Sequence, residues 1–151
     1  MKMKQLDEVD LKILRLLQED ARTPFAKIAR EVGVSEATVH MRVKRLKEMN
    51  ILKGFQALID PSSVGKGLTA ITLIKADPLK YHEILEKLKS MDDVYEVYDV
   101  TGEYDAVVKL RSNSREELAR LIDSIGQIRG VISTLTMIVL KTIKEDTRVR
   151  F

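Results

Sequence analysis

One stretch of the chain, from Thr23 to Glu48, constrains the fold more than any other. Its sequence, TPFAKIAREVGVSEATVHMRVKRLKE, is typical of two short helices joined by a tight turn. Pro24 suits the first turn of a helix, because its φ is already helical and the N–H that it lacks is not needed there. Gly33 suits the left-handed residue that closes this helix, and Ser35 is a good N-cap for the next one. The stretch therefore predicts a compact helix-turn-helix.

The second of these helices differs strongly between its two sides. One side is apolar and is expected to be buried: Val39, Val43, Leu46 and Met49. Four cations and no acid lie between His40 and Lys47: Arg42, Lys44, Arg45 and Lys47. Smaller or polar residues lie nearer its N-terminus: Ala37, Thr38 and Met41. This pattern is typical of a recognition helix, in which small residues approach base edges and cations reach phosphates. An ordinary surface helix with a solvated charged face is the alternative.

The distribution of charge supports the first interpretation. Residues 1–50 hold 11 Lys and Arg against 8 Asp and Glu, an excess of three positive charges. Residues 51–151 hold 15 of each kind, so the net charge of +3 belongs to the half with the predicted helix-turn-helix. Such a distribution is expected if only that half meets a polyanion.

The chain divides by pattern into four parts. A helix over about 7–20 is predicted to complete a three-helix domain, which takes residues 1–51. Residues 52–60 alternate like a strand, which we expect to serve as a wing or hinge. Together with a linker this strand takes residues 52–67. The Gly-, Ser- and Pro-rich sequence PSSVGKG in the linker marks a domain boundary. A second domain takes residues 68–144, and residues 145–151 form a polar tail.

The second domain has the order strand, helix, strand, strand, helix, strand. The predicted elements are Leu68–Ala76, Leu79–Met91, Val94–Val100, Tyr104–Leu110, a helix capped by Ser114 that ends near Gln127, and Val131–Ile143. This βαββαβ order predicts a ferredoxin-like antiparallel sheet with both helices on one face, and the whole chain is therefore of the α+β class. Because two helices cover only one face, we expect a second subunit to cover the other, with the sheets packed face to face.

Several classes of function find no support in the composition. The chain has no Cys, no apolar run of membrane-spanning length and no signal-peptide core, so we expect a soluble, cytoplasmic protein. The only histidines, His40 and His82, fall in different domains, and neither has a Ser, a Cys or a carboxylate at catalytic or metal-binding spacing. We expect no enzyme activity, no metal site and no cofactor.

Three blocks of sequence resemble the Lrp/AsnC family of prokaryotic transcription regulators. They are VGVSEATVHMRVKRLKEMNILKGFQALIDPSSVG, VYEVYDVTGEYDAVVKL and TLTMIVLKTIKE, in the order and spacing of the family. The resemblance extends from Leu6 to Lys144. It implies a DNA-binding domain, an amino-acid-sensing domain, and dimers that assemble into tetramers, octamers or larger rings. It also implies pseudo-palindromic promoter DNA and a free amino acid as partners.

The resemblance also implies two sets of site residues. The recognition-helix pattern of the family falls on Ser35, Ala37, Thr38, Met41, Arg42 and Arg45, to which the charge pattern adds Lys44 and Lys47. Its effector loop falls on Thr101, Gly102, Glu103, Tyr104 and Asp105, and Thr134 and Thr136 lie where the family closes the same pocket between subunits. Such a loop suits a zwitterion, because backbone N–H groups can bind a carboxylate while Glu103 or Asp105 accepts from an ammonium.

These observations predict a transcription regulator whose assembly responds to a small amino acid. Two other classes remain open. One is an architectural DNA-binding protein without an effector. The other is an amino-acid-binding regulatory subunit of an enzyme, whose N-terminal helices dock on protein rather than DNA.

Overall fold

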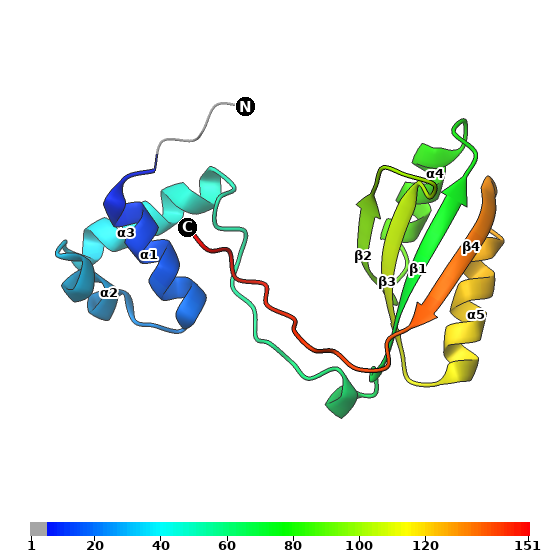
Figure 1. Ribbon diagram of the computed structural model, residues 1–151. Coiled ribbons are helices and arrows are strands. Elements are labelled where there is room, and N and C mark those ends of the chain that lie inside the picture. Colours follow the sequence, from blue (N-terminus) through cyan, green and yellow to red (C-terminus); the bar gives the residue numbers. More distant parts are fainter. Residues whose placement is uncertain (1–5) are drawn as a thin grey trace. The chain divides into compact units, whose positions relative to one another are not determined.

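The computed structural model describes residues 6–151, which form two compact units. The first unit contains the residues up to Leu58 together with Asp146–Phe151, and the second is Ile59–Glu145. Figure 1 shows that the first unit holds the three N-terminal helices and the second holds the sheet.

The first unit contains α1 (Glu8–Glu19), α2 (Phe25–Val32) and α3 (Glu36–Glu48). Each helix has the boundary that its sequence favours. Asp7 caps α1 in a reciprocal capping box with Asp10, and Gly33 ends α2 in the left-handed conformation with a φ of 79°. The side chain of Ser35 accepts a hydrogen bond from the backbone N–H of Thr38, which caps α3. The predicted helix-turn-helix is confirmed.

The three helices share one apolar core. Its buried residues come from all three elements: Ile13 and Leu17 of α1, Ile28 and Ala29 of α2, and Val39 and Val43 of α3. Leu46, the third buried residue of the α3 stripe, is also inaccessible to solvent. Because the buried residues of α3 lie on one side, its opposite side faces outward.

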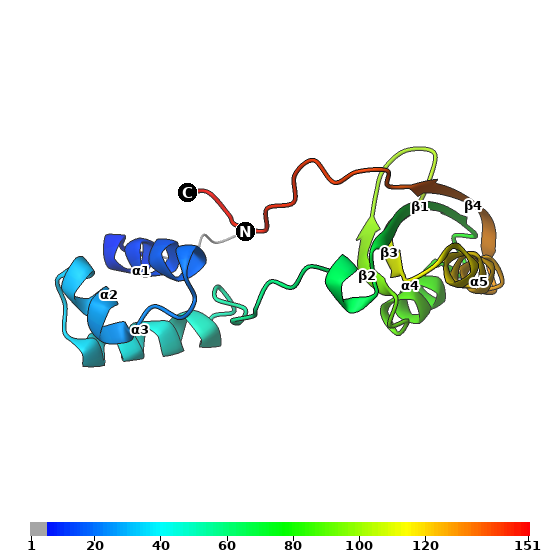
Figure 2. The same ribbon diagram turned by 90° about the horizontal axis from the view of Figure 1, so that it is seen from below.

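The second unit is a four-stranded antiparallel sheet with two helices. Its elements are β1 (Leu68–Ala76), α4 (Tyr81–Lys89), β2 (Val94–Asp99), β3 (Ala106–Ser112), α5 (Arg115–Gly126) and β4 (Val131–Ile138). The strand order is β2-β3-β1-β4, which is the arrangement expected for a ferredoxin-like βαββαβ domain. Figure 2 shows α4 and α5 on the same face of the sheet.

The two faces of the sheet differ in composition and burial. On the helix-covered face the core includes Ala70 and Ile74 of β1 and Val108 and Leu110 of β3, all without solvent exposure. Within residues 59–145, no helix covers the other face (Figure 2), which presents apolar side chains of β1 and β4, with Leu73 opposite Leu135 and Ile71 opposite Met137. The side chains of Leu135 and Met137 are among the exposed large apolar groups.

Three sequence-based expectations about strands were wrong. In the described part of the chain, residues 52–60 form no strand, β3 is Ala106–Ser112 rather than 104–110, and β4 ends at Ile138 rather than at residue 143. A strand needs a neighbour to receive its backbone hydrogen bonds, and no segment within residues 6–151 pairs with 53–60 in this way. Beyond Ile138, the last bond to β1 is from the Val139 N–H to the Thr69 carbonyl oxygen.

The C-terminal residues return to the first unit and bind α1. The side-chain amide of Gln18 bonds both backbone groups of Val149, with distances of 2.9 Å to its oxygen and 2.7 Å to its nitrogen. Arg15 donates through Nε and Nη2 to the carbonyl oxygen of Phe151, at 3.1 and 2.9 Å.

Among residues 6–151, no helix is long and apolar enough to cross a bilayer.

Candidate functional sites

The outward side of α3 presents a mixed apolar and basic surface. Ala37, Met41 and Lys44 follow one another at helical spacing and are exposed, Met41 by 63% of its surface. Thr38 is half-buried beside them, and its hydroxyl lies 2.8 Å from that of Ser35. The cap therefore fixes both the start of the helix and the position of a polar group at the end where base contacts are expected.

Arg42 and Arg45 lie beside this surface and are bound to α1. Asp10 accepts from Arg42 Nη1 at 3.1 Å and from Arg45 Nη2 at 2.5 Å, and Arg42 also pairs with Asp7. The side chain of Asp10 is completely buried, whereas that of Asp7 is 52% exposed. The Arg42 guanidinium is the main cause that lowers the pKa of Asp7 to about 2.

The two lysines have looser surroundings. Lys44 is 80% exposed, and its nearest acid is Glu48 at 4.0 Å, which is an exposed pair of little energetic weight. The ammonium of Lys47 lies 4.8 Å from the centre of the Phe55 ring, in a cation–π contact with the segment that follows α3. Lys44 is therefore held only weakly, while Lys47 has an aromatic partner.

The structure places all eight predicted DNA-binding residues on α3 and its cap, and it holds some of them more firmly than others. Three cations have a partner that limits their reach: Arg42, Arg45 and Lys47. The exposed surface between them contains Ala37, Met41 and Lys44. An exposed helix with cations along its edges is able to enter a groove of DNA and bind the phosphates on either side.

The predicted effector loop joins β2 to β3. Thr101, Gly102 and Glu103 are exposed, and Gly102 has a φ of 119°, a conformation that favours glycine. Tyr104 and Asp105 are half-buried at the base of the loop. The three exposed residues are therefore free to meet a ligand, whereas the last two also belong to the body of the unit.

Hydrogen bonds to the end of β1 fix the base of this loop. The carboxylate of Asp105 accepts from the backbone N–H of Ala76 at 2.8 Å, and its own N–H donates to the Ile74 carbonyl at 2.9 Å. The hydroxyl of Tyr81 lies 2.7 Å from the carbonyl oxygen of Asp105 and 2.9 Å from a carboxylate oxygen of Asp99. Burial, followed by the bond to Asp99, raises the pKa of Tyr81 to about 12.

Thr134 and Thr136 lie on β4, across β1 from the loop. Thr134 pairs with Ile74, whose carbonyl oxygen also accepts from the N–H of Asp105. Thr134 and Asp105 therefore lie at the same end of the sheet. At ordinary strand spacing they are roughly 10 Å apart. Paired residues of antiparallel strands point to the same face, so Thr134 and Thr136 face the helix-covered side. The hydroxyl of Thr136 lies 2.8 Å from that of the buried Thr72.

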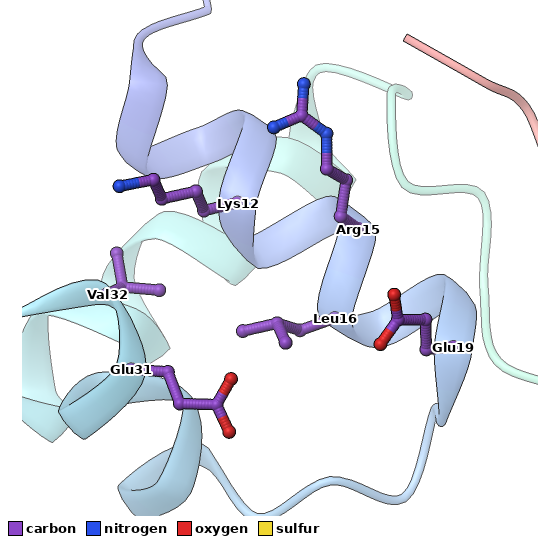
Figure 3. A pocket seen from close by; sticks show the side chains of 6 residues that line it. All are labelled: Lys12, Arg15, Leu16, Glu19, Glu31 and Val32. Atoms are coloured by element: carbon purple, nitrogen blue, oxygen red, sulfur yellow. The ribbon is translucent and has the colours of Figure 1, made fainter.

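A surface depression of about 250 Å³ lies elsewhere, between α1 and α2. Figure 3 shows Leu16 and Glu19 facing Glu31 and Val32 across it, while the guanidinium of Arg15 points away. Its lining contains charges of both signs, Lys12 among them. It includes neither an α3 residue nor a loop residue, so it belongs to neither predicted site.

Sequence reasoning missed three groups that hold these sites in place. Asp10 has the position of a favourable acid at a helix start, and its spacing from Asp7 gives no sign of a role towards α3. Tyr81, which holds the loop, belongs to no motif, and the block of sequence that contains Phe55 gave no sign of its contact with Lys47. Each acts across a distance in sequence that no local pattern encodes.

Comparison with known proteins adds two family domains to this geometry. Residues 6–47 match the AsnC-type helix-turn-helix domain, and residues 69–149 match the Lrp/AsnC ligand binding domain. The chain is 44% identical over 142 residues to the HTH-type transcriptional regulator FL11 of Pyrococcus horikoshii, with 94% of each chain covered. It is 42% identical over 144 residues to the HTH-type transcriptional regulator Ptr1 of Methanocaldococcus jannaschii, covering 95% of this chain and 97% of that one.

Solved structures agree over nearly the whole chain. The structure of Escherichia coli AsnC has a TM-score of 0.89 and 33% identity, covering 96% of this chain and 99% of that one. A structure from Neisseria meningitidis, described as a complex of the transcriptional regulator NMB0573 with L-Met, has a TM-score of 0.89 and 26% identity, covering 97% of each chain.

Proposed function

The chain belongs to the Lrp/AsnC family of transcription regulators, and we propose that it binds specific promoter sites as an oligomer whose assembly responds to a free amino acid. As a member of this family it is a transcriptional regulator with a DNA-binding helix-turn-helix domain and a ligand-binding domain. The observation that carries the proposal is the exposed side of α3, where a packed helix presents small, polar and basic residues together.

DNA recognition is assigned to this side of α3. The residues that discriminate bases are Ala37, Thr38 and Met41. They are short, or lie in the middle of the exposed side of α3, so they can meet base edges in the major groove. The cations that flank them supply affinity that falls with salt, because each phosphate contact releases counterions: Arg42, Lys44, Arg45 and Lys47. Ser35 acts through its cap, which fixes the N-terminal turn of α3.

Effector binding is assigned to the loop between β2 and β3. Its backbone N–H groups around Gly102 bind the carboxylate of an amino acid, and Glu103 accepts from its ammonium. Glu103 suits this role better than Asp105, whose carboxylate already accepts from the N–H of Ala76. Thr101, Tyr104 and Thr134 complete the lining of the proposed amino-acid site. The L-Met in the structure of the Neisseria relative supports an amino acid as the class of ligand.

Assembly is assigned first to the open face of the sheet. Leu73, Leu135 and Met137 contribute to an apolar surface there, and a second copy packed face to face removes it from water. A dimer formed in this way carries two copies of α3, which suits a palindromic site with half-sites about one helical turn apart. Further assembly into tetramers, octamers or larger rings allows several spaced sites to be bound at once.

The ligand acts on DNA binding only if it binds one assembly state better than another. Bound at the end of the sheet that holds both this loop and Thr134, an amino acid changes the contacts available to a neighbouring subunit. The coupling is reciprocal, so DNA that favours one assembly also changes the affinity for the amino acid by the same factor.

Selection from a randomised DNA pool tests the central part of this proposal. We expect enrichment of one palindrome with half-sites about a helical turn apart. Retained DNA without a common motif would favour an architectural role. No retention even at low salt, where attraction to phosphates is strongest, would contradict DNA binding itself.

The effector is tested by adding amino acids one at a time to the selected complex. We expect one of them to change both the DNA affinity and the mass of the assembly measured by light scattering. Glu103→Gln should abolish the response, because a neutral amide binds an ammonium less well than a carboxylate does. Glu116→Gln is the matched control, since Glu116 is an exposed acid in the first turn of α5. An equal response in both variants would contradict the assignment of Glu103.

A further inference from the structure

One acidic side chain of α1 is completely buried against the recognition helix. The carboxylate of Asp10 accepts three hydrogen bonds, from Arg42 Nη1 at 3.1 Å, from Arg45 Nη2 at 2.5 Å and from the backbone N–H of Asp7 at 3.1 Å. A buried carboxylate is costly unless it is paired and hydrogen-bonded, and here both oxygens are. Asp10 therefore holds both arginines of α3 against α1.

The two arginines are held to different degrees. The Arg42 side chain is 22% exposed, and its Nη1 meets both Asp10 and Asp7. The Arg45 side chain is 45% exposed and meets only Asp10 among the acids of the described chain. A guanidinium has five N–H donors in a rigid fork. Arg45 gives Nη2 to Asp10, and the other donors of its half-exposed side chain are not bonded to any acid of residues 6–151.

We propose that Asp10 is a positioning residue for DNA binding, which orients Arg45 so that its free donors meet a DNA phosphate. This inference rests on the function proposed for α3. A guanidinium is suited to the task, because it bonds a carboxylate on one side and a phosphate on another with fixed geometry. Asp10 itself does not touch DNA.

The sign of one substitution separates this role from simple electrostatics. Removing a negative charge near a polyanion should strengthen DNA binding if Asp10 acted only through its charge. If Asp10 instead orients Arg45, its loss weakens DNA binding although the protein becomes more positive. Asp10→Asn keeps the size of the side chain and removes the charge, so it is the informative variant.

The experiment measures binding of the full chain to the DNA selected above, by fluorescence anisotropy at several salt concentrations. Arg45→Ala should lower the affinity about tenfold and flatten the salt slope by about one. Asp10→Asn should lower the affinity and the slope in the same way. In the double variant, Asp10→Asn should add nothing to the effect of Arg45→Ala, because Arg45 is already absent and Arg42 keeps its bond to Asp7.

Asp7→Asn is the matched control, since it removes an exposed acid that contacts Arg42 and leaves the pair of Asp10 and Arg45 intact. It should leave the affinity unchanged or raise it. Circular dichroism establishes that each variant is folded at the assay temperature. If Asp10→Asn does not fold, Arg45→Lys replaces it, because lysine keeps the charge and loses the planar fork; its affinity should fall as that of Arg45→Ala does.

Three results would overturn the inference while leaving the proposed function intact. They are unchanged or tighter binding by folded Asp10→Asn, losses that multiply in the double variant, and normal binding by Arg45→Lys. Failure of the wild-type protein to bind any DNA would instead contradict the proposed function.

Discussion

The two units hold their candidate sites in place by different means. In the three-helix unit, a fully buried carboxylate ties α1 to two arginines of α3, beside a small apolar core. In residues 59–145, all of which are described, the fully buried polar side chains are Thr72 and Ser112, both uncharged, and the core is apolar. The proposed recognition surface thus rests on a buried ion pair, whereas the buried interior of residues 59–145 is uncharged.

The largest expected effect comes from removing the same side-chain volume from the core of each unit. Ile13→Ala and Ile74→Ala each delete a side chain with no solvent exposure and should each cost about 2–5 kcal/mol. Because each unit has its own core, Ile13→Ala should lower only the melting of the helical unit, and Ile74→Ala only that of the sheet unit. Calorimetry with circular dichroism measures both. Equal effects of the two variants on one shared transition would show that the units unfold together.

A smaller effect is expected at two glycines with left-handed backbone. Gly33 has a φ of 79°, and an added Cβ would meet no other atom within 4 Å, so Gly33→Ala should cost about 1–2 kcal/mol from backbone strain alone. Gly130 has a φ of 99°, and an added Cβ would lie 2.3 Å from the Cβ of Lys80. Gly130→Ala should therefore cost more than Gly33→Ala. Urea unfolding measures both, and the reverse order would contradict the close packing at Gly130.

Two helix caps provide a still finer comparison. Ser35 accepts from the N–H of Thr38 at the start of α3, and Ser114 accepts from the N–H of Glu117 at the start of α5, each at 3.1 Å. Replacing either with Ala should cost about 1 kcal/mol of stability. Only Ser35→Ala should also weaken DNA binding, since the proposed recognition surface lies on α3. A similar loss of DNA affinity in Ser114→Ala would place part of that surface in the second unit.

The smallest expected effect concerns acid. Hydrogen bonds, chiefly from Arg42, lower the pKa of Asp7 from 3.8 to about 2 in the folded protein. Its contribution to stability is therefore complete above about pH 4 and is lost as the pH falls towards 2. Asp7→Asn should flatten the pH dependence of the melting temperature in this window. An unchanged pH profile in the variant would show that the pair of Arg42 and Asp7 adds nothing to stability.

Much of the fold follows from local sequence. The apolar stripe that includes Val39 and Val43 predicted the buried side of α3, and the caps at Ser35 and Ser114 were found where they were expected. Strand β1 has the predicted bounds, because an apolar, β-branched run between turn residues has few alternatives. The order of elements then determined the ferredoxin-like arrangement.

The expectations that were wrong or incomplete concern non-local partners. Residues 53–60 alternate like a strand but have no strand beside them in the described chain, and pairing is not written in the alternation itself. The two carboxylates considered for the effector, Glu103 and Asp105, look equivalent in sequence, yet a hydrogen bond from Ala76 distinguishes them. Burial of Asp10 depends on the crossing of α1 and α3, which no local pattern encodes.

The return of Asp146–Phe151 to the helical unit has a topological consequence. The chain leaves that unit after Leu58 and re-enters it at Asp146, so the sheet unit is an insertion within the other and is attached at both of its ends. Two tethers restrict the volume that each unit samples around the other more than one tether does, and they raise the effective concentration of each at the other. A single cut between residues 53 and 58 would leave the second tether in place, closed by the bonds of Gln18 and Arg15 to Val149 and Phe151.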